Sequence, residues 1–171
     1  MPCDVEGRLA EAWRALEAVP DPEVPVLSVV ELGIVRDVRT DDGEGVVVTV
    51  TPTYSGCPAV EAIEADIVSA LGRAGLGPVR VEMRRAPAWT TDWIDEAAQR
   101  KLRDYGIAPP GRVAEGRGAT SPVRVVPRAP LPCPRCDSSD TERLSPFGST
   151  ACKALWRCRA CREPFEHMKP F

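Results

Sequence analysis

Two pairs of cysteines near the C-terminal end constrain this chain more than any other feature. Each pair has the spacing C-x-x-C, Cys133 with Cys136 and Cys158 with Cys161, and residues 137–157 lie between the pairs. Each C-x-x-C turn points two thiolates to one centre, so two turns supply a tetrahedral four-sulfur site that suits zinc or a single iron. Because four protein ligands leave no open position, the spacing predicts a structural metal site, with zinc favoured over iron.

The segment that carries these cysteines, residues 133–171, is too short to bury a sizeable core by itself. Modules of this size commonly take their folding free energy from the bound metal, so we expect a separate, small, zinc-ribbon-like module. Cys152 lies between the two pairs. It is either a buried small hydrophobic residue or a spare ligand or reactive thiol beside Lys153, and the first reading is favoured.

The cysteine count and the N-terminal sequence indicate a reducing compartment. The chain has seven cysteines, and residues 1–6 lack a basic start that leads into an apolar stretch. An odd count with repeated C-x-x-C pairs favours metal ligation in the cytosol over disulfides. The apolar runs are only a few residues long, whereas a membrane span needs roughly 20. We therefore expect a cytoplasmic protein with no membrane association.

Histidine content excludes several classes of enzyme. His167 is the single histidine of the chain, so sites that need two histidines from one chain, such as the H-E-x-x-H zinc helix, cannot form. The hydrolase, dinucleotide-binding and P-loop motifs are also missing from the sequence. No catalytic residue is assigned, and the chain is not expected to be an enzyme by itself.

Charge divides the sequence into three parts. Residues 1–106 carry a net charge of −8, residues 107–132 carry +3 and residues 133–171 carry +2, which sum to −3. The middle part holds six prolines and three glycines, which is typical of a semi-rigid linker. We expect one domain over 1–106, a linker over 107–132 and the metal module over 133–171. The acidic chain makes nucleic-acid binding an unfavoured alternative.

Residues 1–106 have the pattern of an α+β domain. Apolar periodicity predicts the element order α-β-β-α-β-α, a small mixed sheet with helices packed on it. Strands are expected at 34–38, 46–51 and 79–83, and a third helix is expected to be capped by Thr91 and ended by Gly106. The apolar face expected for the second helix consists of Val60, Ile63, Ile67, Val68 and Leu71.

Cys57 precedes Pro58, which we expect at the first position of the second helix. Free backbone N–H groups and the helix dipole would lower the pKa of a thiol at that place. Cys57 is therefore either a nucleophile or soft-metal ligand, or a capping thiol without chemistry. Asp21 and Glu23 lie in a proline-bounded loop, where they either serve a thiolate-bound metal or a basic partner, or form a solvated acidic loop.

Two stretches of the sequence resemble a known domain. D-P-E-V-P-V-L-S-V-V-E-L-G-I-V at 21–35 and T-P-T-Y-S-G-C-P at 51–58 resemble the domain of SufT and the eukaryotic MIP-type cytosolic iron–sulfur targeting factors. W-T-T-D-W-I at 89–94, F-G-S-T-A-C-K at 147–153 and the two C-x-x-C pairs are similar to the PaaD (PaaJ) family of the bacterial phenylacetate-degradation cluster. The resemblance covers nearly the whole chain except the proline-rich stretch.

The resemblance implies an accessory protein of the phenylacetyl-CoA epoxidase, a multicomponent monooxygenase with an oxygenase and a reductase component. It implies help with iron–sulfur cluster or iron-centre maturation of those two partners; the alternative is a non-catalytic structural subunit. A transient iron–sulfur cluster or iron would be the cargo, and a homodimer is suggested by relatives. By position, Cys57 is the functional thiol, with Asp21, Glu23 and Thr51 lining its site. The metal ligands are Cys133, Cys136, Cys158 and Cys161.

Limited proteolysis is expected to cut the chain first between residues 107 and 132. The reason is the proline, glycine and arginine content of this stretch, which lacks any helix or strand periodicity. Mass spectrometry of the first tryptic fragments measures the positions of the cuts. First cuts inside residues 46–71 would contradict the predicted boundary.

Overall fold

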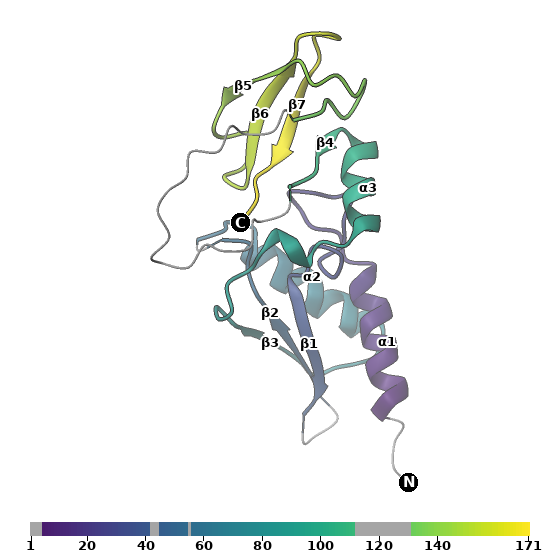
Figure 1. Ribbon diagram of the computed structural model, residues 1–171. Helices are drawn as coiled ribbons and strands as arrows, with labels where there is room; N and C mark the ends of the chain where they lie inside the picture. Colours follow the sequence, from purple (N-terminus) through teal and green to yellow (C-terminus); the bar gives the residue numbers. More distant parts are fainter. Residues whose placement is uncertain (1–4, 42–44, 55, 112–130) are drawn as a thin grey trace. The chain divides into compact units, whose positions relative to one another are not determined.

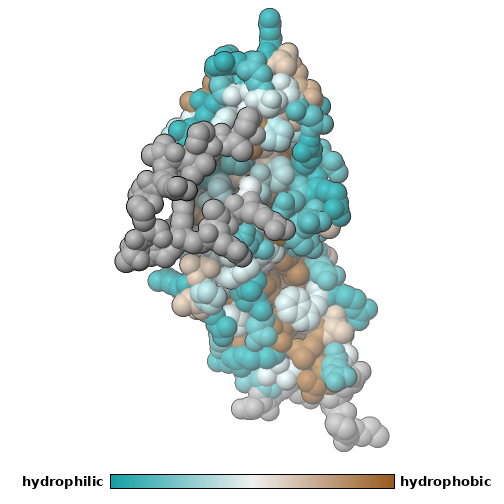
Figure 2. Space-filling view, viewed as in Figure 1, coloured by the Kyte–Doolittle hydropathy of each residue, from teal (hydrophilic) through white to brown (hydrophobic). Residues whose placement is uncertain are grey.

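A computed structural model describes residues 5–41, 45–54, 56–111 and 131–171 (Figure 1). The chain forms two compact units, Met1–Ala98 and Gln99–Phe171, and each is described by itself. Among the helices in the described ranges, none is long and apolar enough to cross a membrane. Figure 2 shows a mostly hydrophilic face on the second unit in this view, whereas brown, hydrophobic surface gathers near β1 and α1 of the first unit.

The first unit has the predicted α+β fold with the predicted element order. Its elements are α1 (Val5–Glu17), β1 (Val35–Thr40), β2 (Val46–Val50), α2 (Val60–Arg73), β3 (Val79–Met83), the 3₁₀ turn η1 (Thr91–Trp93) and the start of α3 (Glu96–Tyr105). The amphipathic α1 buries Ala12 and Leu16, and α2 buries Ile63, Ile67 and Leu71. For α2, the helical periodicity in the sequence therefore identified Ile63, Ile67 and Leu71 as core-facing residues.

The sheet of the first unit has the strand order β1-β2-β3. β1 and β2 form an antiparallel hairpin, whereas β2 and β3 run parallel in an unbroken register from Val46↔Val79 to Val50↔Met83. Parallel neighbours need a crossover, and α2 provides it. All five residues of β2 are buried. As a result, the ends of β2 and β3 lie side by side, where the N–H of Arg84 donates to the carbonyl of Val50 at 2.8 Å.

The proline-bounded loop after α1 is fixed by its own polar side chains. The buried carboxylate of Asp21 accepts hydrogen bonds from the backbone N–H groups of Glu23 (2.9 Å) and Val24 (2.7 Å). Ser28 and Glu31 form a reciprocal capping box, with each backbone N–H donating to the other's side chain at 3.0 and 3.1 Å. These bonds satisfy backbone donors that prolines and turns would otherwise leave unpaired.

Some local predictions are wrong, each for a local reason. Thr91 does not cap the third helix: Thr90 caps the η1 turn, and α3 begins later, where the carboxylate of Asp95 accepts from the N–H of Ala98 at 2.7 Å. Val68 is 44% exposed instead of lying on the buried face of α2. Pro58 does not begin α2, because a turn precedes the helix, which starts at Val60 with Ala59 as its N-cap.

The second unit contains a four-stranded sheet in the order β4-β7-β6-β5. Its strands are β4 (Ile107–Ala108), β5 (Thr141–Ser145), β6 (Lys153–Cys158) and β7 (Pro164–Met168). β6 pairs antiparallel with both β5 and β7, and the short β4 pairs parallel with β7. Ala108, Cys133, Cys158 and Phe165 form a buried cluster, with Leu131 and Trp156 packed against it.

Most of the predicted linker lies outside the described residues, which resume at 131. At its start, Ile107 and Ala108 form β4 in the sheet of the second unit. The division into 1–106, 107–132 and 133–171 stays a prediction.

A four-sulfur centre and a thiol cleft

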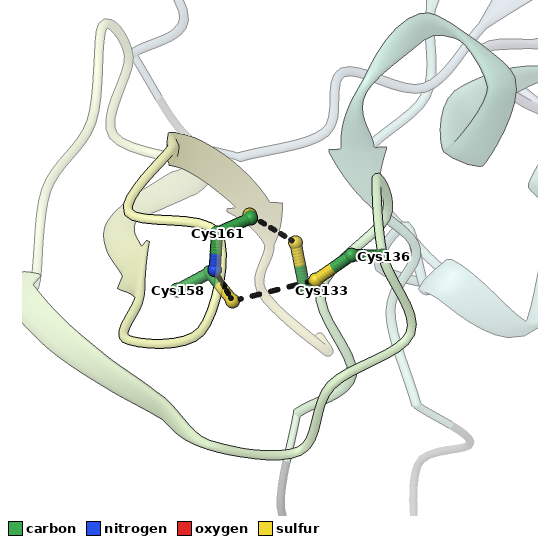
Figure 3. A group of neighbouring side chains, drawn as sticks. All are labelled: Cys133, Cys136, Cys158 and Cys161. Carbon is green, nitrogen blue, oxygen red and sulfur yellow. Dashed lines mark hydrogen bonds between the residues drawn. The ribbon is translucent and has the colours of Figure 1, made fainter.

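The two C-x-x-C pairs meet at one point in the second unit. Figure 3 shows the four cysteine side chains with their sulfur atoms turned toward one another. The Sγ atoms of Cys133 and Cys161 are 3.8 Å apart, those of Cys136 and Cys158 are 3.6 Å apart, and all four lie within 4.8 Å of one another. A zinc ion with Zn–S bonds of about 2.3 Å in a tetrahedron requires sulfurs roughly 3.8 Å apart. The four sulfurs therefore fit a bound zinc ion, which would tie the two turns together.

The pKa values of two of these thiols, Cys158 and Cys161, are shifted by their neighbours. The N–H of Cys161 lies 3.5 Å from the Sγ of Cys158, and this backbone bond, with the neighbouring thiols, lowers the pKa of Cys158 to about 7. For Cys161, the backbone bond to Glu163 acts to lower the pKa, but desolvation and the adjacent thiols raise it to about 12. Cys158 therefore loses its proton more readily than Cys161, and a bound cation would favour the thiolate form of both.

Cys152 does not belong to the four-sulfur centre. It is buried, its Sγ lies 3.0 Å from the hydroxyl of Thr150, and its backbone carbonyl accepts from Lys169 at 2.9 Å. The neighbouring Lys153 is also buried, and its Nζ forms an ion pair with Glu166 at 2.9 Å. This environment favours the reading of Cys152 as a packed side chain over that of a spare ligand.

Cys57 lies in the first unit, in the turn before α2, and lines a cleft of about 580 Å³. Gly56, just before it, has φ +85°, a conformation that favours glycine. Met83 at the end of β3 and Arg85 just beyond reach the same cleft because β3 runs parallel to β2. The lining residues are Pro52, Gly56, Cys57, Pro58, Val60, Glu61, Met83 and Arg85.

The pKa of Cys57 is raised, contrary to the expectation of a lowered value. Burial is the main cause, and the negative charges of Glu23 and Asp21 add to it. Hydrogen bonds with the backbone of Ala59 and the side chain of Tyr54 act in the opposite direction but do not prevail. The expectation failed because α2 begins three residues after Cys57, so the helix end stabilises a thiolate less than the desolvation and the carboxylates oppose it.

The other predicted site residues, Asp21, Glu23 and Thr51, are not among the residues that line this cleft. Asp21 and Glu23 act on Cys57 through their charge but are not lining residues. Thr51 is 1% exposed, and among the described residues no group hydrogen-bonds to its Oγ1. Sequence reasoning missed Tyr54, whose turn spacing from Cys57 is a usable signal, and also Met83 and Arg85, which only the sheet topology brings near.

Comparisons with known proteins match both the segment that carries the four-sulfur centre and the segment that carries Cys57. The family of the PaaD zinc beta ribbon domain matches residues 119–169, and that of the iron–sulfur cluster assembly protein matches residues 9–83. An Escherichia coli (strain K12) protein, named as a candidate subunit of 1,2-phenylacetyl-CoA epoxidase, is 48% identical over 159 residues, which are 93% of this chain and 91% of that protein. The chain belongs to the PaaD family.

Two further relatives each cover more than half of this chain. An Fe–S protein maturation auxiliary factor from Porphyromonas gingivalis (strain ATCC BAA-308 / W83) is 33% identical over 90 residues, covering 52% of this chain and 85% of that protein. The crystal structure of a domain of unknown function, DUF59, from Bacillus anthracis has a TM-score of 0.53 at 30% identity, covering 57% of this chain and 92% of that one. This PaaD-family chain therefore combines a DUF59-like fold with a cysteine cluster that fits metal.

Replacing Cys158 by Ser is expected to remove the bound metal and leave residues 131–171 sensitive to protease. The reason is that Cys158 is both a ligand candidate and a member of the buried cluster. The metal-to-protein ratio, measured by inductively coupled plasma mass spectrometry, checks the outcome. Cys152→Ser is the matched control and should keep the metal. Full metal content in the Cys158 variant would contradict the ligand assignment.

The rate at which Cys57 is alkylated should depend on the charges around it. Glu23→Gln removes a negative charge that raises the pKa of Cys57, so the pKa falls and the thiolate fraction at pH 8 rises. Iodoacetamide should then modify Cys57 several-fold faster, as measured by peptide mass spectrometry over time. Glu11→Gln on the exposed side of α1 makes the same charge change at another place and should leave the rate unchanged. Equal rates for the two variants would show that Glu23 does not act on the thiol.

Proposed function

We propose that this protein is a cytoplasmic accessory factor of the phenylacetyl-CoA epoxidase that assists the loading of iron or an iron–sulfur cluster into the oxygenase or the reductase. The name of the Escherichia coli relative supports the link to the epoxidase. The match of residues 9–83 to the iron–sulfur cluster assembly protein family supports the maturation role. The observation that carries the proposal is the Cys57 thiol in an open cleft inside that matched segment.

The raised pKa of Cys57 suits a transient site for a cation. With its pKa raised, the thiol is protonated at neutral pH and gives up its proton when a metal ion arrives, since a coordinating cation displaces that proton. The carboxylates of Glu23 and Asp21, which raise the pKa, also make the surroundings favourable for positive charge. The positive charge of bound cargo is thus balanced by release of the thiol proton. When the thiol takes up a proton again, departure of the cargo is favoured.

A single thiol is an incomplete ligand set for a cluster, which proteins hold by several cysteines. The other ligands would come from the client or the cargo's own carrier, which fits passing the cargo on rather than storing it. Thr51 precedes the cleft residue Pro52, and its hydroxyl has no hydrogen-bond partner within the part of the chain that the structure describes. Buried polar atoms without a partner are rare in proteins, and a functional role is one explanation for them.

The metal module, residues 133–171, would serve as a structural and docking module. Its four sulfurs leave no open coordination position, so metal held there has no room for a substrate and no catalytic role is assigned to it. A second candidate function follows from the word subunit in the name of the Escherichia coli relative. In that alternative, the protein is a non-catalytic structural part of the assembled epoxidase, and Cys57 is dispensable.

Replacing Cys57 by Ala is expected to leave folding intact and abolish support of the epoxidase. The side chain is small and partly exposed, so the free energy of unfolding should change by about 1 kcal/mol or less. The test co-expresses the oxygenase and reductase with either version of this protein. Epoxidase activity and the cluster occupancy of the reductase are then measured, with Cys3→Ala as a control that removes a different thiol.

The result separates the two candidates. Loss of activity or occupancy with Cys57→Ala, but not with Cys3→Ala, supports cargo handling at the cleft. Equal activity and occupancy with both variants rejects that role. If the protein then co-purifies in fixed stoichiometry with the epoxidase, the alternative of a structural component stands.

A further inference from the structure

The outer edge of β3 is a candidate for pairing with another strand. In the described ranges of the first unit, β2 is the only strand that pairs with β3. Figure 1 shows β3 at one edge of the sheet and β1 at the other. The register of β1 shifts between Val35 and Asp37, whereas that of β3 is unbroken over five residues. Bulges discourage pairing with another chain, so β3 is the better template of the two edges.

The hydrogen bonds between β2 and β3 identify the residues of β3 whose backbone groups face outward. The N–H of Val46 donates to the carbonyl of Pro78, and the N–H of Arg84 donates to the carbonyl of Val50, both at 2.8 Å. Backbone groups of successive strand residues point in alternate directions. Even-numbered residues of β3 therefore bond to β2. The backbone groups of Val79, Val81 and Met83 point to the open edge.

The sequence of β3 is complementary to itself when reversed. Val79-Arg80-Val81-Glu82-Met83 has apolar residues at both ends and at the centre, with opposite charges on either side of Val81. We propose that β3 pairs antiparallel with β3 of a second copy of this chain, centred on Val81, so that the two sheets join into one. In this register every outward backbone group of β3 meets an outward group of the second copy.

Charge pairing favours this register over others. Arg80 of one copy faces Glu82 of the other, and the reverse, at the non-hydrogen-bonded positions where opposite side chains come closest. Within one chain both side chains already belong to an exposed ion row: Arg80 lies 3.4 Å from Glu82, and Arg39 of β1 lies 2.9 Å from Glu82. A second copy would extend this row of charges across the junction between the two β3 strands, which we call the seam.

The other face of the seam is apolar at its centre. A groove of about 640 Å³ runs between α2 and β3, and its lining residues are Glu61, Glu64, Ala65, Val68, Ser69 and Val81. Val68 is 44% exposed and Met83 is 36% exposed. Pairing of two copies would cover both, with the carboxylates left at the hydrated rim. The inference does not rest on the proposed role of Cys57.

A charge-swap series on the full-length, metal-loaded protein tests this dimer. The dimer dissociation constant is measured by sedimentation equilibrium over a wide concentration series. Arg80→Glu and Glu82→Arg each put like charges opposite each other twice, so each should weaken the dimer about tenfold or more. The double variant restores opposite charges and should recover the wild-type constant to within about threefold. Arg39 lies on β1, away from the seam. Arg39→Glu therefore breaks the ion pair with Glu82 but should change the dimer dissociation constant little.

Val81→Pro provides a second measurement. It removes an outward N–H that the β2–β3 ladder does not use, so the variant should fold with the wild-type circular dichroism spectrum yet remain monomeric. If this variant does not fold, the charge-swap series still decides. A wild-type protein that stays monomeric at all concentrations overturns the proposal, as does a dimer whose dissociation constant is the same in all charge variants.

Discussion

The burial of β2 on both of its faces is the constraint on which the first unit depends. All five of its residues, Val46–Val50, are buried. Arg39 of β1 lies opposite Val47 and Glu82 of β3 lies opposite Thr49, and these two side chains form an ion pair. A strand buried on both faces needs a neighbour at each edge, and here one neighbour is antiparallel and the other parallel. The parallel neighbour places the end of β3 beside the end of β2. Met83 and Arg85 reach the cleft of Cys57 for this reason.

Much of the fold could be predicted because its signals are local. The apolar periodicity of α2 and the β-branched run of β2 predict those elements, and the C-x-x-C spacing is sufficient to bring four sulfurs together. The thiol cleft was harder to predict. The start of α2 depends on a turn at residues 57–59, and the pKa of Cys57 depends on charges from a loop more than 30 residues earlier. Neither effect has a sequence pattern of its own.

The two sulfur sites of this chain differ in how their charge is balanced. In the second unit, four thiols share one centre, and two of them, Cys133 and Cys158, are also part of the buried cluster. Bound cation and core packing thus stabilise the same residues. In the first unit, a single thiol lies in an open cleft, where burial and the negative charges of Glu23 and Asp21 disfavour its ionisation. The first arrangement fits a structural metal site, and the second fits the cargo exchange that we propose for Cys57.

The mixed sheet of the first unit also has a consequence for the order of folding. The hairpin of β1 and β2 closes over a short turn, so its contacts form at a low cost in chain entropy. β3 can join only after α2 has crossed the sheet, because its pairing with β2 is parallel and distant in sequence. The wall that Met83 and Arg85 contribute to the cleft is therefore completed after the hairpin has formed. During synthesis, Cys57 leaves the ribosome before that wall exists and spends this interval as an unprotected thiol.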